Sequence, residues 1–238
     1  MTGSTVAVGL TPLHVVLPLR TLSGVKARLG GAVDAEERQT LILGMARRTV
    51  ALLLAWPGCE RLHLVSPDLA LLRAVEPDGA ASGAERLSRL VQDGEGLGAA
   101  IISGRERALE EGAVSLLVLP GDLPELSHEA LDRLALAADA GLAAAAGGPL
   151  VAIAPAAARG GTNALLLRPP DAIDPAFGEA SFEAHLRAAA AAGAAVQVVP
   201  DEALGYDLDT PDDLERLDPE RLRELMRLGQ EREEGVGG

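Results

Sequence analysis

The chain has 238 residues, 48% apolar and 24% charged, a composition that is ordinary for a globular protein and excludes disordered and collagen-like classes. Its 35 acidic and 21 basic residues give a formal charge of −14, so the surface field should repel polyanions and we expect no nucleic-acid partner. One cysteine, no positively charged leader and no apolar run of bilayer length favour a cytoplasmic protein without disulfides, thiolate zinc sites or a membrane partner.

The first half of the chain alternates between short apolar runs and helical periodicity. Residues 13–19 predict a buried strand, followed by a loop rich in glycine and polar residues. Asp34 and Glu37 have the spacing of a capping box, and the apolar positions after them predict a helix that ends before Pro57. Residues 61–65 and 87–91 then read as strands on either side of a short helix over 67–74.

The alternation continues after a glycine-rich turn at residues 93–98. A helix over 99–111, a strand over 115–119 and a helix capped by Ser127 are expected next. Beyond residue 149 the predicted order is two strands, a helix over 182–192 and a strand over 195–199. These patterns predict an α/β fold in one domain, residues 1–230, with a mixed, mostly parallel sheet between helices, and a solvated flexible tail over 231–238.

A loop with three cations follows the first predicted strand. Arg20, Lys26 and Arg28 lie close together in an otherwise acidic chain, and Lys26 is its only lysine. Ligands of open α/β sheets bind beyond the carboxyl ends of the strands, and phosphate requires positive charge and accessible amides. The loop is therefore a candidate triphosphate site, with a solvated basic loop as the alternative.

Two further strand ends carry candidate residues. The turn Gln92–Gly98 offers glycines and a helix N-terminus to an anion, although a flexible turn explains it equally well. Asp122 directly follows an apolar strand, where its carboxylate could serve a hard cation or simply form the turn before the next helix.

Two carboxylates stand together near the C-terminus. Asp207 and Asp209 are spaced by one residue and would point to the same side of an extended segment. Thr210 and Pro211 have the pattern of an N-cap and a first helical residue. Helix capping accounts for Asp209 without a metal but less readily for Asp207, so a metal shared with Asp122 is a hypothesis here.

The segment between these stations contains small and polar residues. Thr162 and Asn163 follow a glycine pair at a strand start, and Gly178 and Ser181 precede a helix whose N-terminus could face an anion. His185 is expected on a helix face. The other histidines, His14, His63 and His128, lack the spacing of metal ligands.

Seven segments in order, LPLRTLSGVKARL, VSPD, QDGEGLGAAIISG, LPGDLPEL, RGGTNALLLRPP, FGEASFEAHL and LGYDLDTPDDL, resemble the phosphoenolpyruvate and 2-phospho-L-lactate guanylyltransferase family of deazaflavin coenzyme F(420) biosynthesis. The resemblance runs from Leu13 to Leu214. It implies the fold of nucleotide-diphospho-sugar transferases and a reaction in which the phosphate of a three-carbon acid attacks the α-phosphorus of GTP and releases pyrophosphate. Phosphoenolpyruvate is the favoured acceptor, with 2-phospho-L-lactate and 3-phosphoglycerate as alternatives.

The resemblance also implies roles for individual residues. Lys26, Arg28 and Asp122 would be catalytic, Mg²⁺ would be held by Asp122, Asp207 and Asp209, and the acceptor would be met by Thr162, Asn163, Gly178 and Ser181. The nucleotide would be bound by Leu17, Pro18, Arg20, Lys26, Arg28, Ser66, Asp93, Gly94, Gly96 and Leu97.

The chain departs from the family pattern at three places. Arg20 stands where lysine is usual, and VKARL replaces AKSRL without loss of either cation. Gly98 stands where asparagine is usual, which removes a side chain that could touch the nucleotide and puts the strictness for GTP in doubt. A nucleotide-sugar glycosyltransferase and a non-catalytic nucleotide-binding module are the alternatives, and the oligomeric state, a homodimer included, stays open.

Overall fold

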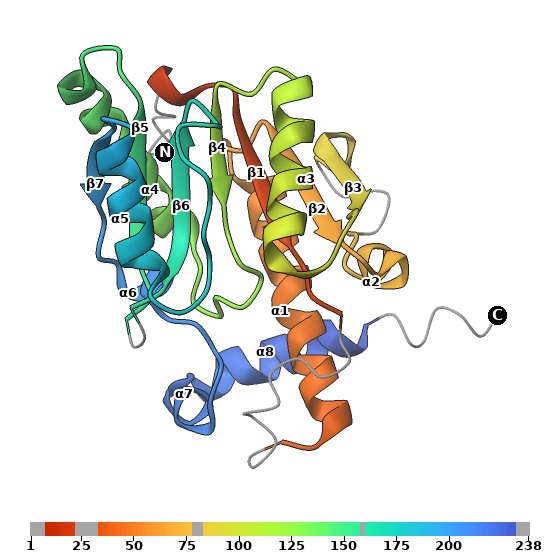
Figure 1. Cartoon of the computed structure of the whole chain (residues 1–238). Helices are drawn as coiled ribbons and strands as arrows, with labels where there is room; N and C mark the ends of the chain where they lie inside the picture. The colour runs from red at the N-terminus through yellow and green to blue at the C-terminus, as the bar shows by residue number, and fades with distance from the viewer. Residues whose placement is uncertain (1–7, 22–32, 78–82, 158–159, 232–238) are drawn as a thin grey trace, which may run out of the picture.

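The computed structural model describes residues 8–21, 33–77, 83–157 and 160–231, built around one mixed sheet (Figure 1). The sheet has seven strands in the order β3-β2-β1-β4-β6-β5-β7. Their bounds are β1 Leu13–Pro18, β2 Arg61–Ser66, β3 Leu87–Val91, β4 Ser115–Val118, β5 Leu150–Pro155, β6 Thr162–Arg168 and β7 Ala195–Val198. The strands expected from the sequence are all present, with bounds that differ by one or two residues.

Strand direction places the polar ends of the strands at one edge. Strand β1 pairs in parallel with β2 and β4, and β2 with β3, whereas β6 is antiparallel to both β4 and β5. Strand β7 is parallel to β5. The start of β6 therefore lies at the same edge as the carboxyl ends of the other described strands, which we call the carboxyl edge. It is the lower edge in Figure 1.

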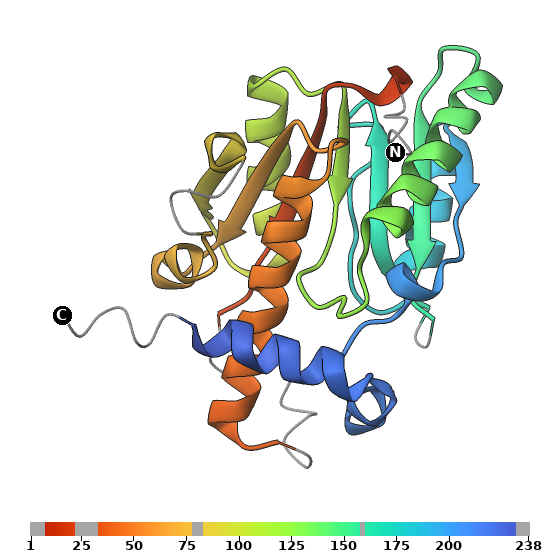
Figure 2. The ribbon, with the colours of Figure 1, turned by 180° about the vertical axis from the view of Figure 1, so that it is seen from behind.

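Helices cover both faces of this sheet. Helices α3 (Gly96–Glu110) and α5 (Ser181–Ala191) lie on the near face in Figure 1, and α1 (Ala35–Ala55) and α4 (His128–Ala145) lie on the other, as the reverse view of Figure 2 shows. The shorter helices are η1 Val8–Leu10, α2 Leu69–Ala74, η3 Ala84–Arg86, α6 Glu202–Gly205 and α7 Pro211–Arg216. The layered α/β arrangement confirms the predicted fold class.

Each face of the sheet has its own apolar core, because alternate strand residues point to opposite faces. Leu17, Leu64 and Leu117 pack with α1 and α4 residues such as Leu53 on one side, and Val16, Val65 and Val118 pack with α3 on the other. The central strands β1, β4, β5 and β6 are therefore buried on both faces.

Several helix starts agree with the sequence patterns, whereas α3 starts earlier than expected and α6 and α8 were not predicted. Asp34 caps α1 in the predicted capping box with Glu37, and Ser127 caps α4. Helix α3 begins at Gly96, three residues before the expected start, so Gly96 and Gly98 lie in its first helical turn. The C-terminal helix α8, Pro219–Gln230, was not among the predicted elements. None of the helices described is long and apolar enough to cross a membrane.

Helix α8 crosses α1 at the carboxyl edge through two glycines. A Cβ at Gly44 would meet the Leu225 carbonyl oxygen at 1.8 Å, and one at Gly229 would meet the Thr40 carbonyl oxygen at 2.1 Å. Around this crossing a third apolar cluster packs, formed by Leu41, Met45, Leu208, Leu217 and Leu225. The two backbones thus approach too closely to admit a Cβ at either glycine, and the same cluster includes Leu208, which separates Asp207 from Asp209.

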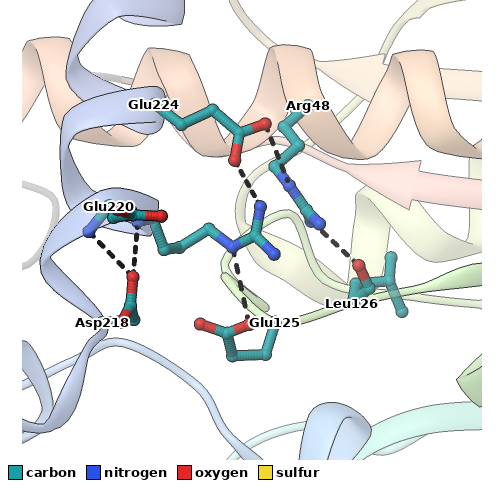
Figure 3. A network of polar contacts seen from close by, with 7 residues as sticks. Arg48, Glu125, Leu126, Asp218, Glu220 and Glu224 are labelled. Atoms are coloured by element: carbon teal, nitrogen blue, oxygen red, sulfur yellow. Dashed lines mark hydrogen bonds and ion pairs between the residues drawn. The ribbon is translucent and has the colours of Figure 1, made fainter.

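A polar network joins α1, α8 and the loop after β4 (Figure 3). The Arg48 guanidinium donates to the Leu126 carbonyl at 2.9 Å and lies 3.8 Å from a Glu224 carboxylate oxygen. Arg221 forms ion pairs with Glu224 and, at 3.5 Å, with Glu125. Because Arg48 is only 13% exposed, its main-chain contact is shielded from water and helps to fix the loop that begins at Asp122.

Two histidines are buried in the sheet near its opposite edge. The His14 Nδ1 and His63 Nε2 atoms are 3.0 Å apart, and His63 Nδ1 lies 2.6 Å from the Ser88 hydroxyl. Burial lowers the pKa of His14 and lowers that of His63 to about 3, so both imidazoles are neutral at pH 7. The two imidazoles and the Ser88 hydroxyl thus form a chain of hydrogen bonds between uncharged groups inside the fold.

Replacing Gly44 with alanine should destabilise the protein, because the new Cβ would collide with the backbone of α8. We expect a loss of roughly 1–3 kcal/mol in the free energy of unfolding, measured by urea denaturation. Gly98→Ala is the matched control: it lies in helix α3 with nothing within 4 Å of a Cβ, and should be neutral or stabilising by ~0.5–1 kcal/mol. Equal stability of the two variants would contradict the close crossing.

The buried histidines should make the protein sensitive to acid. Since their pKa values are lower in the folded than in the unfolded chain, their full contribution is present above pH about 6.5 and is lost as the pH falls towards 3. His63→Leu should therefore lose less unfolding free energy than the parent between pH 7.5 and pH 5. His128→Gln is the control, and a His63 variant with unchanged acid sensitivity would contradict the assignment.

Candidate functional site

The carboxyl edge gathers the described residues that the sequence marked as functional. They lie at the carboxyl ends of β1 and β2, in the segments that follow β1, β3 and β4, at the starts of α3, β6 and α5, and just before α5 and α7. The residues are Leu17, Pro18, Arg20, Ser66, Asp93, Gly94, Gly96, Leu97, Asp122, Thr162, Asn163, Gly178, Ser181, Asp207 and Asp209. Lys26 and Arg28, the two cations assigned to the triphosphate, lie outside the described residues.

The glycine-rich turn between β3 and α3 is shaped by one buried side chain. Gly94 and Gly96 have φ angles of 93° and 85°, values that side chains rarely tolerate. The Gln92 side-chain amide donates to the carbonyls of both glycines, at 3.0 and 3.2 Å. Gln92 was not assigned a role from the sequence, and its position directly after an apolar strand was the available signal.

That turn leads into a helix N-terminus whose amides are open to a ligand. The N-cap residue of α3, Glu95, makes no side-chain capping hydrogen bond. Asp93, Gly94 and Gly96 are exposed, whereas Leu97 packs partly against the α3 core. A helix start with exposed glycines in front of it suits an anion, because amide hydrogens and the helix dipole both favour negative charge.

The ends of β1 and β2 differ in what they expose. Leu17 and Pro18 are buried, and Ser66 is fully buried with its hydroxyl accepting from the Asp68 amide at 3.1 Å. Arg20 is exposed. Of these four predicted nucleotide residues, Arg20 therefore offers its side chain, and the buried ones shape the edge from beneath.

A main-chain hydrogen bond joins the two aspartate stations. The Leu208 amide donates to the Asp122 carbonyl at 3.1 Å, so the loop after β4 lies against the segment Asp207–Asp209. Leu208 itself is buried, and its two aspartate neighbours and Asp122 are each half-buried. Residues far apart in the sequence thus meet at one point of the carboxyl edge.

The segment that carries Asp207 and Asp209 is held by Asp213. One Asp213 carboxylate oxygen accepts from the amides of Asp209 and Thr210, at 3.1 and 2.8 Å, and from the Thr210 hydroxyl at 2.7 Å. Thr210 is the N-cap of α7 in a capping box with Asp213, as the sequence predicted for its N-cap. Since Thr210 provides the cap, capping does not explain Asp209.

The donor set at this point suits a magnesium ion chemically. Mg²⁺ prefers carboxylate oxygens and usually retains waters and substrate phosphates beside one or two protein carboxylates. Among the described residues the three aspartates do not form a compact set of three ligand atoms; the group within 4.8 Å of one another is His14, His63 and Glu111. A metal ion at this point would therefore need water or substrate oxygens in addition to these carboxylates.

The histidine group is at the opposite edge of the sheet and has other partners. Glu111, which follows α3, forms an ion pair with Arg61 at 3.2 Å, and the two imidazoles bond to each other. The sequence spacing of His14 and His63 did not indicate that they are neighbours, because strand register brings them together. With each of these three side chains partnered, this cluster stabilises the core.

On the other side of the carboxyl edge, Thr162 and Ser181 bond to each other. The Ser181 hydroxyl accepts from the Thr162 amide at 2.8 Å, and the Thr162 hydroxyl lies 2.9 Å from His185 Nδ1. Gly178, with a φ of 133°, is exposed in the loop before them. His185 lies on a face of α5, as the sequence predicted. That face is the one towards the sheet, one turn after Ser181, so His185 is completely buried.

Asn163 carries an unsatisfied donor at the same edge. It is 6% exposed, and its side-chain nitrogen has no hydrogen-bond partner among the described residues. A buried amide without a partner costs free energy, so such a group normally meets a ligand or an ordered water. It lies at the irregular end of β6, where the register with β5 shifts between Ala154 and Pro155.

The chain resembles known proteins over nearly all of the described fold. Residues 13–218 match the family described as guanylyl transferase CofC like. A phosphoenolpyruvate guanylyltransferase from Rubrobacter xylanophilus is 46% identical over 206 residues, which cover 87% of this chain and 93% of that protein. A 3-phospho-D-glycerate guanylyltransferase from Colwellia psychrerythraea is 31% identical over 204 residues, 86% of this chain and 90% of the other.

A solved structure confirms the fold that the sequence implied. The protein, described as a nucleotide-diphospho-sugar transferase from Desulfovibrio desulfuricans G20, superposes with a TM-score of 0.66 at 20% identity and covers 92% of this chain and 97% of its own. The likeness shows the fold, and the family match with the sequence relatives identifies the chain as a member of the CofC-like guanylyl transferase family.

Proposed function

We propose that this protein transfers GMP from GTP to the phosphate of phosphoenolpyruvate and releases pyrophosphate, as a step in deazaflavin coenzyme F(420) biosynthesis. Its family membership and the name of the Rubrobacter xylanophilus relative support the reaction class and the acceptor. The carboxyl edge supports the same reaction, because one end of it suits a nucleotide and the other an anionic acceptor.

The observation that carries the proposal is the hydrogen bond between the Leu208 amide and the Asp122 carbonyl. This hydrogen bond joins the segment that carries Asp122 to the segment that carries Asp207 and Asp209. Along the carboxyl edge, the junction lies between the glycine-rich turn after β3 and the hydroxyl pair of Thr162 and Ser181. A nucleotidyl transfer needs acidic oxygens for a metal at the junction of its two substrates. A glycosyltransferase and a non-catalytic module would not account for this arrangement together with the guanylyltransferase relatives.

In the proposed reaction, an oxygen of the acceptor phosphate forms a bond to the α-phosphorus of GTP while the bond to the bridging oxygen of pyrophosphate breaks. The acceptor oxygen is already ionised at neutral pH, so no side-chain nucleophile or general base is required. Positioning and charge stabilisation then supply most of the rate.

Repulsion between the two anionic substrates explains why the proposed site contains cations and carboxylates that could hold a metal. A chain with a formal charge of −14 must bring two anions together, so cations have to be concentrated locally. Lys26, Arg28 and Arg20 would neutralise the triphosphate as pyrophosphate leaves. Mg²⁺, held by Asp122 with Asp207 or Asp209, would supply Lewis-acid stabilisation of the phosphate oxygens.

The acceptor would lie against the start of β6 and α5. Thr162, Ser181 and Asn163 would offer hydrogen-bond donors, and Gly178 would let the acceptor approach the main chain. A second acceptor of the same chemistry is 3-phosphoglycerate, since the Colwellia psychrerythraea relative is named for it. Both acids carry a phosphate and a carboxylate on three carbons, and 2-phospho-L-lactate shares these groups.

Purified protein with GTP and Mg²⁺ should release pyrophosphate when phosphoenolpyruvate is added. Parallel assays with 2-phospho-L-lactate and 3-phosphoglycerate, followed by mass measurement of the guanosine diphospho adduct, identify the preferred acceptor. The proposal expects the highest kcat/KM with phosphoenolpyruvate. Absence of turnover with all three acids would overturn it.

Asp122→Asn should abolish most of this activity without unfolding the protein, because the amide keeps the shape but not the charge of the carboxylate. We expect kcat/KM to fall on the order of 100-fold or more. Asp171→Asn is the control, since Asp171 is exposed beyond the opposite end of β6. Unchanged turnover of the Asp122 variant at saturating Mg²⁺ would show that this carboxylate does not hold the metal.

Removal of divalent cations should stop the reaction reversibly. After treatment with a chelator and desalting, we expect turnover to disappear and to return on addition of Mg²⁺. Thermal unfolding should change little in the absence of nucleotide, because carboxylates that hold Mg²⁺ together with substrate oxygens bind it weakly alone. Full activity in the chelator would refute a metal-dependent mechanism.

A further inference from the structure

The two hydroxyls at the proposed acceptor end accept hydrogen bonds from the protein itself. Ser181 Oγ receives the Thr162 amide proton at 2.8 Å, and Thr162 Oγ1 lies 2.9 Å from the buried His185. A hydroxyl has a single proton to donate and two lone pairs to accept with. If the protein partner occupies a lone pair of the hydroxyl, the hydroxyl can donate its proton to a substrate. If the partner takes the proton, the hydroxyl can only accept.

The direction of the bond between His185 and Thr162 follows from the other side of the ring. The Ala176 amide donates to His185 Nε2 at 2.9 Å, and an amide has only a proton to give, so Nε2 carries no proton. Burial lowers the pKa of His185 to about 4, which keeps the imidazole neutral at pH 7. Its one proton is therefore on Nδ1 and is donated to Thr162 Oγ1.

We infer that His185 is a positioning residue that makes the Thr162 hydroxyl a donor towards an anionic acceptor group. With one lone pair occupied by the His185 Nδ1 proton, the hydroxyl directs its own proton away from the imidazole. Ser181 is polarised in the same way by the Thr162 amide. The result is a pair of hydroxyl donors suited to a phosphate or carboxylate.

The same imidazole also ties the neighbouring loop to helix α5. Through Ala176 it anchors the segment that leads to Gly178, and its ring packs edge-on against Phe177 with centroids 5.2 Å apart. His185 is fully buried, so it contacts the acceptor through Thr162 and the loop rather than directly. This inference rests on the proposed function, which supplies the anionic acceptor.

Two amide variants separate the positioning role from simple packing. The side-chain nitrogen introduced by His185→Asn would stand near the place of Nδ1 and could still donate to Thr162, whereas the longer amide of His185→Gln reaches the place of Nε2 and serves only Ala176. In His185→Asn we expect a KM for phosphoenolpyruvate within about threefold of the parent. In His185→Gln and His185→Leu we expect an increase of about 10-fold or more, with the KM for GTP unchanged.

A double-mutant cycle tests whether His185 acts through Thr162. Thr162→Val removes the hydroxyl, so adding His185→Gln should raise the KM for phosphoenolpyruvate no further. Additive increases, equal increases in the KM for GTP, or a glutamine variant that behaves like the parent would overturn the inference. Thermal unfolding of each variant shows that it is folded. If the His185 variants fail to fold, Thr162→Val and Thr162→Ser test the hydroxyl that His185 is inferred to position, and an equal KM for phosphoenolpyruvate in these two variants would overturn the inference.

Calorimetry with phosphoenolpyruvate and inorganic phosphate, in the absence of GTP, separates failure of the proposed function from failure of the positioning role of His185. Wild-type protein without turnover on any acceptor would refute the proposed function, while the binding of these anions would still report on the hydroxyl pair. Turnover with no difference among the His185 variants would refute the positioning role alone. The inference expects weaker anion binding by the glutamine variant than by the asparagine variant, and equal binding would contradict it.

Discussion

The hydrogen bond from the Leu208 amide to the Asp122 carbonyl is the contact on which the arrangement of the candidate site depends. It closes the fold between the central strand β4 and the C-terminal segment. Apolar packing of Leu208 with α1 and α8 protects it, and Asp213 and Arg48 hold the two segments from either side. A main-chain bond between two segments that are each anchored in this way keeps their carboxylates in a defined relation.

Repulsion between the two anionic substrates accounts for much of the remaining arrangement of the candidate site. An acidic protein that joins two anions needs donors whose polarity is set before substrate arrives, because reorganisation during the reaction raises the barrier. Gln92 sets the glycine-rich turn by bonding its carbonyls, and His185 sets the hydroxyl of Thr162. Both side chains are buried and touch the site through another group. Such residues hold the substrate-contacting groups of an active site in position, although they need not contact the substrate themselves.

The stable part of the protein lies away from the reacting groups. The two cores flank the strands, and the neutral histidine chain from His14 to Ser88 is near the opposite edge. The carboxyl edge instead collects exposed glycines, helix starts and half-buried carboxylates, above the third apolar cluster where α8 crosses α1. This division is the usual consequence of placing a site at the strand ends of an α/β sheet, where loops change without disturbing the core.

The sequence alone determined the strands, most helices and the family, because apolar periodicity, capping residues and strand-end motifs are local features. Asp34, Ser127 and Thr210 cap the helices that their patterns predicted. The tertiary structure decided which distant residues meet: the pairing of Asp122 with Leu208, the burial of His185 against Thr162, and the contact of His14 with His63. These depend on strand order, register and helix docking, and such non-local contacts leave no periodic signal in one sequence.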